Sequence, residues 1–304
     1  MELGLSEEQI LLGDAIGQIC ADQFPLSALR ALEKCGEPFP VPLWRALSDM
    51  GIGGMVIPEE RGGLGMGMLD VAVAYERFGH HLLSSPHWVS ALVAGPLLLA
   101  AADDEATAAA WLPHIIDGGR ILTLASREPG RGREDRPGDT RLTRLDGGWR
   151  LDGRKVFVPF AQQADGLLVL AGDGDRLVVC LVPPDAPGVA ITPEPNLGGE
   201  AYGTVAFDGV TLAAGQVLAG GADITEAWRA TMFAALVPLA ARAVGAARHI
   251  HDISLAYAKE RQAFGRPIGG FQAIAHDLAE AAVAVEGCRT LVHQAAWLHD
   301  QGRP

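Results

Sequence analysis

The hydrophobic residues of this chain change their spacing twice along the sequence. Up to about residue 119, apolar side chains recur every three to four residues, and this helical spacing returns from about residue 221 to Pro304. Between these blocks the period is close to two, with hairpin signals at Asp146-Gly147 and Gly172-Asp173-Gly174. The order predicts an α+β fold with an N-terminal α-helical domain (1–119), a middle antiparallel β-barrel or sandwich domain (120–220) and C-terminal helices (221–304).

Charge and composition exclude several classes of protein. The formal net charge of -13 argues against a general nucleic-acid surface. The N-terminal sequence MELGLSEEQI lacks the basic start and apolar stretch of a secretory signal, and the apolar run ALVAGPLLLAAA is shorter than the roughly 20 residues that cross a bilayer. The 4 cysteines are widely separated without a CxxC spacing. We therefore expect a cytoplasmic protein with no metal site, no nucleic-acid partner and no membrane partner.

A helix-breaking turn separates two long helical segments near the end of the sequence. The first helical pattern ends at about Arg261, because Gly265 and Pro267 stop it, and the second begins at about Phe271. Arg261 at this junction presents a guanidinium that can bind a pyrophosphate through two parallel hydrogen bonds. The alternative is an ordinary helical hairpin in which Arg261 caps helix carbonyls.

Four segments, in order along the chain, follow the pattern of one known family. They contain Ile57, Pro58, Glu59, Glu60, Gly62, Gly63 and Gly65 within the stretch from Met50 to Leu82; Glu128, Pro129 and Gly130; Leu151, Asp152, Gly153 and Lys155; and Arg261, Phe264, Gly265, Pro267, Ile268, Phe271 and Gln272. The last set closely resembles the signature of acyl-CoA dehydrogenases. The earlier sets resemble that family's N-terminal helical domain, the loop that contacts flavin and substrate, and the strand beside the flavin.

The resemblance implies FAD as the cofactor and an acyl-CoA thioester as the substrate, which undergoes α,β-dehydrogenation. It further implies that Arg261, Phe264 and Gln272 bind the ADP portion of FAD, and that Gly132 and Phe157 contact flavin or substrate. The C-terminal domain of the family is a four-helix bundle, whereas this sequence has two of those helices. We therefore expect an incomplete bundle in this chain, and a homo- or hetero-oligomer with another acyl-CoA dehydrogenase subunit.

The catalytic base of the family has no counterpart among these residues. Relatives place a glutamate either in a late loop or on the helix before the arginine turn. Counting back from Arg261 without gaps puts the helix position at Ala235, which cannot accept a proton. Glu226 and Glu260 lie nearby as alternative bases. We assign no catalytic residue.

The segments that would contact the flavin ring also depart from the family pattern. Where relatives have a Gly-Ser-Asp run, this chain has Gly132, Arg133 and Glu134. The tryptophan and threonine beside the flavin become Phe157 and Pro159. Phe157 can still cover a ring face, but Pro159 offers neither a hydroxyl nor an amide hydrogen.

These departures favour the base-lacking subunit of a mixed oligomer, in which a partner supplies the base and the flavin-ring contacts. Three alternatives remain open at this point. One is a complete homo-oligomeric enzyme whose late-loop glutamate follows Pro304. The others are a non-catalytic structural subunit that binds acyl-CoA and FAD, and a flavin-dependent monooxygenase on the same fold.

Three further patterns have simpler explanations. The glycine run at residues 63, 65 and 67 lacks the strand and helix of a dinucleotide fingerprint and predicts turns. His249 and His251 are two residues apart on a predicted helix and should point to different faces, so they are poor metal partners. Four arginines in one loop predict either a solvated charged loop or contacts with CoA phosphates. They are Arg127, Arg131, Arg133 and Arg136.

Overall fold

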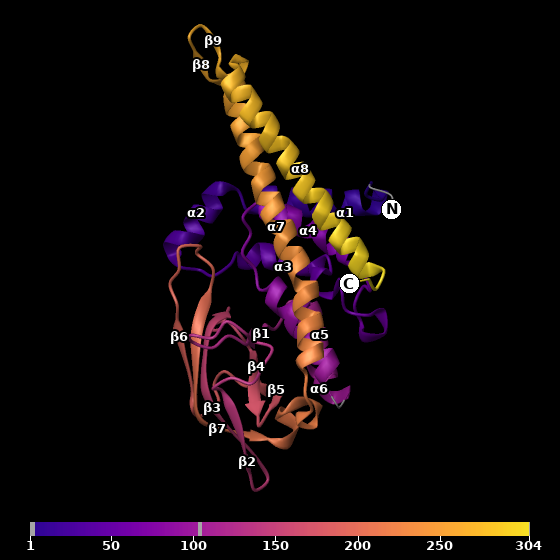
Figure 1. Cartoon of the computed structure of the whole chain (residues 1–304), viewed down its shortest axis with the longest axis vertical. Helices are drawn as coiled ribbons and strands as arrows, with labels where there is room; N and C mark the ends of the chain where they lie inside the picture. Colours follow the sequence, from indigo (N-terminus) through magenta and orange to yellow (C-terminus); the bar gives the residue numbers. More distant parts are fainter. Residues whose placement is uncertain (1–3, 103–104, 304) are drawn as a thin grey trace. The chain divides into compact units, whose positions relative to one another are not determined.

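A computed structural model describes residues 4–102 and 105–303 (Figure 1). The helices before the sheet are α1 (Glu7–Gln23), α2 (Leu26–Cys35), α3 (Val41–Asp49), α4 (Met68–His80), α5 (Gly95–Ala101) and α6 (Glu105–Ile116), with short 3-10 helices at Ile52–Gly54 and Glu59–Arg61 and a π-helix at Trp88–Ala94. The strands are β1 (Leu122–Ala125), β2 (Arg141–Leu145), β3 (Gly148–Pro159), β4 (Gly166–Asp173), β5 (Arg176–Val182), β6 (Val189–Pro193) and β7 (Tyr202–Ala213). After 3-10 turns at Ala214–Gln216 and Leu218–Gly221 come α7 (Thr225–Glu260), the short strands β8 (Gln262–Ala263) and β9 (Arg266–Pro267), a 3-10 turn at Ile268–Gly270, and α8 (Gln272–Asp300).

The element order is helices, then a curled sheet, then helices, which confirms the predicted α+β class. The chain also divides into two compact units that combine segments far apart in sequence. Unit 1 contains the residues up to Arg30, Met66–Leu83 and the residues from Leu236 on. Unit 2 contains Ala31–Gly65 and Ser84–Ala235, and therefore the whole sheet. The domain boundaries at residues 119 and 220 stay a prediction.

The sheet of unit 2 follows the strand order β1-β4-β2-β3-β7-β6, with β5 paired to β4. Most neighbours are antiparallel, as predicted, but β1 pairs with β4 in parallel and β2 meets β4 in parallel at one residue pair. Strand β4 is buried from Gly166 to Gly172. A side chain at Gly166 would meet the Trp111 ring at 2.4 Å, so α6 packs directly on this strand.

Local signals in the sequence predicted several turns and caps correctly. Ser6 and Gln9 form a capping box at the start of α1, in which the Ser6 hydroxyl accepts from the Gln9 amide at 3.2 Å. The predicted hairpin signals join β2 to β3 and β4 to β5, with Gly147 and Gly174 at positive φ. The predicted helix break around Gly265 separates α7 from α8.

Two glycines allow α4 and α7 to cross at backbone contact within unit 1. A Cβ at Gly79 would lie 1.9 Å from the Arg242 carbonyl oxygen, and one at Gly245 would lie 1.9 Å from the Glu76 carbonyl oxygen. Real side chains do not tolerate such distances, so the helices could not approach this closely with alanine at either position.

Polar contacts then connect α4 to α8. The Glu76 carboxylate accepts hydrogen bonds from Arg289 at 3.0 Å and from His293 at 2.7 Å. Burial alone would raise the pKa of Glu76, but these two partners hold the pKa below its usual value. At the start of α4, the Asp300 carboxylate accepts the Met68 amide at 2.6 Å and so caps the positive end of the helix.

Among the described helices, α7 is long and apolar enough to cross a membrane by length and composition. Its most apolar window of 18 residues has a mean hydropathy of 1.5 and is 33% buried. A core helix of a soluble protein passes the same test, so the property alone does not assign a location. Several large apolar side chains are exposed along α7, namely Phe233, Leu236, Ile250, Ile253 and Tyr257.

Candidate functional site

The loop that joins β1 to β2 is held at its base by a buried ion pair. Lys155 on β3 donates to the Glu128 carboxylate at 2.9 Å and to the Ser126 carbonyl at 3.0 Å. The same carboxylate accepts the amides of Asp139 at 2.6 Å and Thr140 at 2.9 Å. One buried acid therefore connects the first residues of the loop to its last residues.

The Glu128 carboxylate stays ionised because donors surround it. Burial would raise its pKa, but the hydrogen bonds from Lys155 and from the two loop amides lower the pKa of Glu128 to about 2. Burial lowers the pKa of Lys155, and Glu128 opposes this effect. With side chains only 3% and 5% exposed, both partners are well shielded from water, and the hydrogen bond between them favours the charged form of each.

Phe157 lies on a β-bulge of β3 in a conformation that side chains rarely adopt. Its φ is 52°, and the register between β3 and β7 shifts between Lys155 and Val158. The Phe157 amide donates to the Glu194 carboxylate at 3.3 Å, which helps to hold the bulge. The Phe157 side chain is 53% exposed, so the bulge presents an aromatic ring outward. An exposed ring of this kind can stack on a flat ligand, and the assignment of Phe157 as a flavin or substrate contact stays a prediction.

Arg127 borders this ring, and Glu134 pairs with Arg127. The Arg127 guanidinium lies 5.9 Å from the centre of the Phe157 ring, a cation–π distance. The Glu134 carboxylate accepts the Ser126 hydroxyl at 2.7 Å and lies 3.5 Å from Arg127. Gly132, the other predicted contact on this loop, is exposed and has open space around it. Its backbone therefore remains accessible to a ligand.

The turn between α7 and α8 gathers the predicted ADP-binding residues in unit 1. Arg261 follows the last residue of α7, and its carbonyl accepts the Ile268 amide at 2.9 Å, which closes the turn. Phe264 has a φ of 51° and is 96% exposed, and Gln272 begins α8. The Arg266 guanidinium stacks 4.1 Å from the centre of the Phe271 ring and so connects the turn to the residue before α8.

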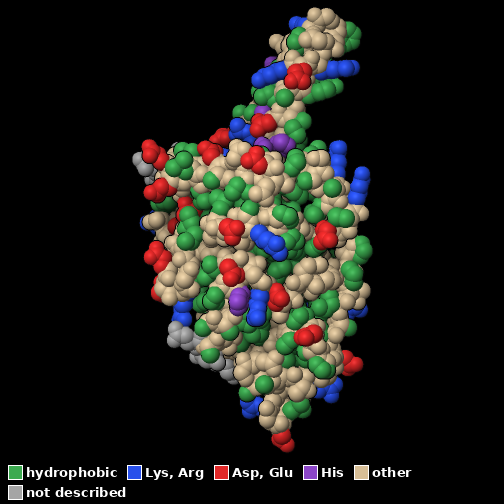
Figure 2. All heavy atoms as spheres, turned by 180° about the vertical axis from the view of Figure 1, so that it is seen from behind, with side chains coloured by type: hydrophobic (Ala, Val, Ile, Leu, Met, Phe, Trp, Pro, Cys, Tyr) green, Lys and Arg blue, Asp and Glu red, His purple; other side chains and the backbone are tan. Residues whose placement is uncertain are grey.

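The cation at this turn has no acidic partner. Among the described residues, no carboxylate lies within ion-pair distance of Arg261, and its side chain makes no hydrogen bond to a helix carbonyl. The alternative interpretation as a capping residue is therefore not supported. At the top of Figure 2, blue and red side chains both lie near the end of this hairpin. The turn thus offers free positive charge beside an exposed aromatic ring.

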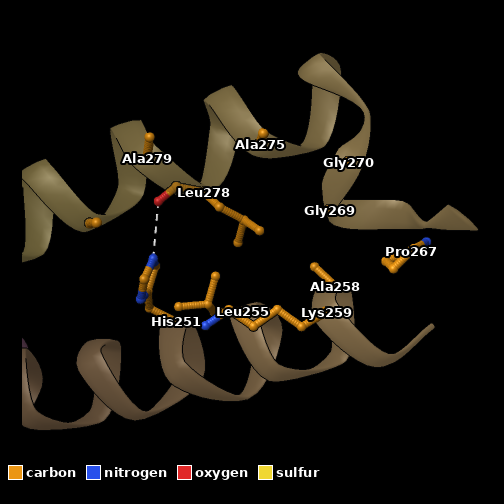
Figure 3. Close-up of a pocket in the computed structure, with 11 residues that line it drawn as sticks. His251, Leu255, Ala258, Lys259, Pro267, Gly269, Gly270, Ala275, Leu278 and Ala279 are labelled. Atoms are coloured by element: carbon orange, nitrogen blue, oxygen red, sulfur yellow. Dashed lines mark hydrogen bonds between the residues drawn. The ribbon is translucent and has the colours of Figure 1, made fainter.

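A groove of about 530 Å³ lies between α7 and α8 near the turn (Figure 3). It is lined mainly by small and apolar side chains, including Leu255, Ala258 and Leu278. His251 closes one end through a hydrogen bond with the Leu278 carbonyl at 3.0 Å. No carboxylate is among its lining residues in the described part of the chain, so this groove suits apolar packing better than acid–base chemistry.

The candidate positions for a base do not provide one. Ala235 is 1% exposed on α7, and its carbonyl accepts the Trp88 indole at 2.8 Å. Glu226 has an 86% exposed side chain that pairs with Arg229 at 2.7 Å. Glu260 is exposed at the end of α7. Both acids are exposed to water, and neither lies in a closed apolar pocket.

The remaining sequence patterns have structural roles. Gly63 and Gly65 lie in turns, where a side chain at Gly63 would meet the Ile57 carbonyl oxygen at 2.1 Å. His249 and His251 face different neighbours, as predicted: the first stacks 4.0 Å from the His80 ring, and the second contacts α8. Among the described residues no group of three or more His, Cys, Asp or Glu side chains could hold a metal ion.

In the sequence, only the family pattern points to Glu128 and Lys155 of the buried pair. Their spacing of 27 residues carries no local signal, because β3 returns to the loop only through the folding of the sheet. Gly138 is the local sequence feature that reflects the position of the Glu128 carboxylate. A side chain at Gly138 would lie 2.1 Å from the Glu128 carboxylate, so only glycine lets the loop backbone approach it.

Solved structures define the class of this fold. The chain superposes on glutaryl-CoA dehydrogenase from Mycobacterium smegmatis with a TM-score of 0.91 and 25% identity, covering 99% of this chain and 78% of that one. It also matches a structure of the ChsE4-ChsE5 complex from Mycobacterium tuberculosis with a TM-score of 0.88 and 28% identity, covering 99% and 80%. The fold is thus that of the acyl-CoA dehydrogenases.

Sequence comparisons then establish the family. Residues 6–119 match the acyl-CoA dehydrogenase N-terminal domain, and residues 234–304 match the acyl-CoA dehydrogenase C-terminal domain. Benzylmalonyl-CoA dehydrogenase from Aromatoleum aromaticum is 31% identical over all of this chain and 82% of its own length. Acyl-CoA dehydrogenase FadE27 from Mycobacterium tuberculosis is 32% identical over 88% of this chain and 69% of its own length. The chain belongs to the acyl-CoA dehydrogenase family, and FAD is its cofactor.

Proposed function

We propose that this chain is the base-lacking subunit of a mixed oligomer that carries out FAD-dependent α,β-dehydrogenation of an acyl-CoA thioester. The observation that carries the proposal is the buried methyl group of Ala235 where some relatives have a glutamate. A positioned base contributes about 100- to 10,000-fold to rate, so this chain needs a partner group for proton removal. Two structural neighbours support a mixed oligomer, because the ChsE4-ChsE5 complex and Tcur3481-Tcur3483 each carry the names of two proteins.

The turn between α7 and α8 binds the ADP portion of FAD in this proposal. The Arg261 guanidinium, which has no acidic partner among the described residues, contacts the diphosphate, and Gln272 provides amide hydrogen bonds at the start of α8. The exposed Phe264 ring supplies an apolar surface beside them. When bound, FAD accepts the hydride that leaves the β-carbon of the substrate.

In this proposal, the loop between β1 and β2 positions the thioester group of the substrate. The buried Lys155 and Glu128 pair fixes the loop base, so the open backbone at Gly132 keeps a defined position. The outward Phe157 ring covers one face of a flat ligand and excludes water from it. These residues bind and orient, and none of them removes a proton.

The alternatives predict different behaviour of the bound flavin. A complete homo-oligomer would use a glutamate outside these residues, a structural subunit would perform no chemistry, and a monooxygenase would use reduced flavin and oxygen. The test is to purify the chain alone and with candidate partner subunits, load FAD, and add acyl-CoA without oxygen. The visible flavin spectrum reports reduction, and dithionite added afterwards shows that the flavin can be reduced at all.

The proposal expects bleaching by acyl-CoA only when the partner subunit is present. Bleaching by this chain alone would contradict the base-lacking role. Absence of bleaching in both samples, with normal bleaching by dithionite, would contradict the dehydrogenase function and favour the monooxygenase or the structural subunit.

A further inference from the structure

The β-bulge that carries Phe157 interrupts the hydrogen bonding between β3 and β7. The pairing of the two strands stops after Lys155 and resumes at Val158. Val156 and Phe157 therefore lie together opposite a single residue of β7, Thr204. A bulge of this kind leaves the amides of its residues without their usual acceptors on the neighbouring strand. Each of these two amides needs an acceptor from elsewhere.

Two segments of unit 2 supply these acceptors. The Val156 amide donates to the Arg127 carbonyl at 2.9 Å, at the start of the loop between β1 and β2. The Phe157 amide donates to the Glu194 carboxylate at 3.3 Å, in the hairpin that joins β6 to β7. The backbone on either side of the Phe157 side chain is thus tied to both the loop and the hairpin.

Glu194 is itself held at both ends. The buried Thr204, which lies opposite the bulge, donates its hydroxyl to the second oxygen of the Glu194 carboxylate. The Glu194 amide donates to the Tyr202 carbonyl at 2.8 Å. The backbone and the carboxylate of Glu194 therefore have fixed partners on β7, and the acid reaches the Phe157 amide from a defined position.

Asn196 closes the hairpin just beyond Glu194. Its side-chain amide donates to the Glu200 carbonyl at 2.6 Å, and its side-chain oxygen accepts the Glu200 amide at 3.3 Å. Asn side chains commonly stabilise turns by hydrogen bonds of this kind to nearby backbone. The connection between β6 and β7 is therefore ordered on the side from which Glu194 approaches the bulge.

The direction of the Phe157 ring depends on this backbone support. Its φ of 52° is a conformation that a residue with a side chain keeps only when its surroundings hold it. The Tyr202 ring meets the Phe157 ring edge to face, with centres 6.3 Å apart and planes at 84°. Without the Glu194 carboxylate the Phe157 amide loses its acceptor, and the backbone can relax to a negative φ that turns the ring away.

We propose that Glu194 is a positioning residue, which holds the Phe157 ring in the orientation that covers the flavin ring of FAD. The inference rests on the proposed function, because it takes Phe157 as the cover of a flat ligand. Glutamine at position 194 could replace the carboxylate, since its oxygen can accept the Phe157 amide while its amide group donates to the Thr204 hydroxyl. Alanine offers neither group.

The test is calorimetric titration of the FAD-free assembled complex with FAD and, separately, with ADP. Only FAD carries the flat ring, so a lost ring contact weakens FAD binding and leaves ADP binding unchanged. The variants are Glu194→Ala, Glu194→Gln, Phe157→Ala, and the double variant of Glu194→Ala with Phe157→Ala. The control is Asp185→Ala, which removes the same charge from an exposed position on the turn between β5 and β6.

We expect Phe157→Ala to bind FAD about 5- to 10-fold more weakly and Glu194→Ala to bind it about threefold or more weakly, with unchanged ADP affinity in both. Glu194→Gln and Asp185→Ala should each retain FAD affinity within about twofold. The double variant should bind FAD as Phe157→Ala does, because Glu194 acts through the ring.

Unchanged FAD affinity in Glu194→Ala would overturn the inference, and so would a full additional loss from Glu194→Ala in the Phe157→Ala background. The proposed function fails in a different way. If acyl-CoA bleaches the flavin of this chain alone, while the variants bind FAD as expected, the base-lacking role is wrong and the positioning role stands. If bleaching requires the partner, while Glu194→Ala binds FAD normally, the positioning role is wrong and the proposed function stands.

Discussion

At the scale of single residues, Glu128 shows how one carboxylate organises a loop. Its two oxygens accept from a lysine on β3 and from two amides at the end of the loop. A charge buried in this way is stable only while its donors remain, because water cannot replace them. The loop and the sheet should therefore lose stability together when either partner is removed.

We expect Glu128→Gln to lower the free energy of unfolding by about 3 kcal/mol, because Lys155 is left buried with one charged partner fewer. Urea unfolding of the variant and of the unaltered protein at pH 7 measures the difference. The double variant Glu128→Gln with Lys155→Met should lose less than the sum of the two single variants, since no unpaired charge remains. Strictly additive losses would contradict the coupling.

The same pair predicts a dependence of stability on acid. The pKa of Glu128 falls from 4.5 to about 2 on folding, so its contribution to stability is complete above about pH 4.5 and is lost as the pH falls toward 2. Urea unfolding between pH 5 and 2 should show this loss in the unaltered protein and a smaller loss in the double variant. Equal pH profiles would show that Glu128 titrates normally in the folded protein.

At the scale of elements, the crossing of α4 and α7 depends on two glycines. Gly79 and Gly245 each leave room for a carbonyl oxygen of the other helix. Gly287 on α8 has nothing within 4 Å of the position of its missing Cβ. The three residues are all helical glycines, yet only the first two lie at a helix contact.

We expect Gly245→Ala to destabilise the protein by about 2–3 kcal/mol, because the added methyl group would lie 1.9 Å from the Glu76 carbonyl oxygen and force the helices apart. The matched variant Gly287→Ala should stabilise α8 by about 0.5–1 kcal/mol, since alanine restricts the unfolded chain and meets no neighbour. Thermal unfolding of both variants tests this contrast. A similar shift for the two variants would contradict the close approach of α4 and α7.

Local chemistry explains which elements the sequence could predict. The Ser6 and Gln9 cap, the break around Gly265 and the two hairpins depend on neighbouring residues, so their signals are visible in the sequence. The parallel pairing of β1 with β4 depends on contacts between segments about 40 residues apart. A period of two along each strand indicates a strand, but it does not say which neighbour it pairs with or in which direction.

At the scale of the whole molecule, the predicted order of helices, sheet and helices was correct, and the family resemblance supplied the candidate cofactor site. The sequence did not predict the two compact units, because α4 belongs with α8 through contacts between Glu76 and Arg289 that are 213 residues apart. It also did not distinguish Arg136, which has no acidic partner among the described residues, from Arg127, Arg131 and Arg133 of the same loop, which each pair with an acid. That difference depends on where the carboxylates of the folded loop lie.

The central claim is that the Arg261 guanidinium binds the diphosphate of FAD. The most direct measurement is FAD retention, as the ratio of bound flavin to protein after gel filtration of the assembled complex, for the unaltered chain, Arg261→Gln and Arg248→Gln. The last variant removes the same charge from α7, where Arg248 already pairs with Asp252 at 3.3 Å. We predict that Arg261→Gln lowers FAD affinity about tenfold or more while Arg248→Gln retains it. Unchanged FAD retention in Arg261→Gln would contradict the account.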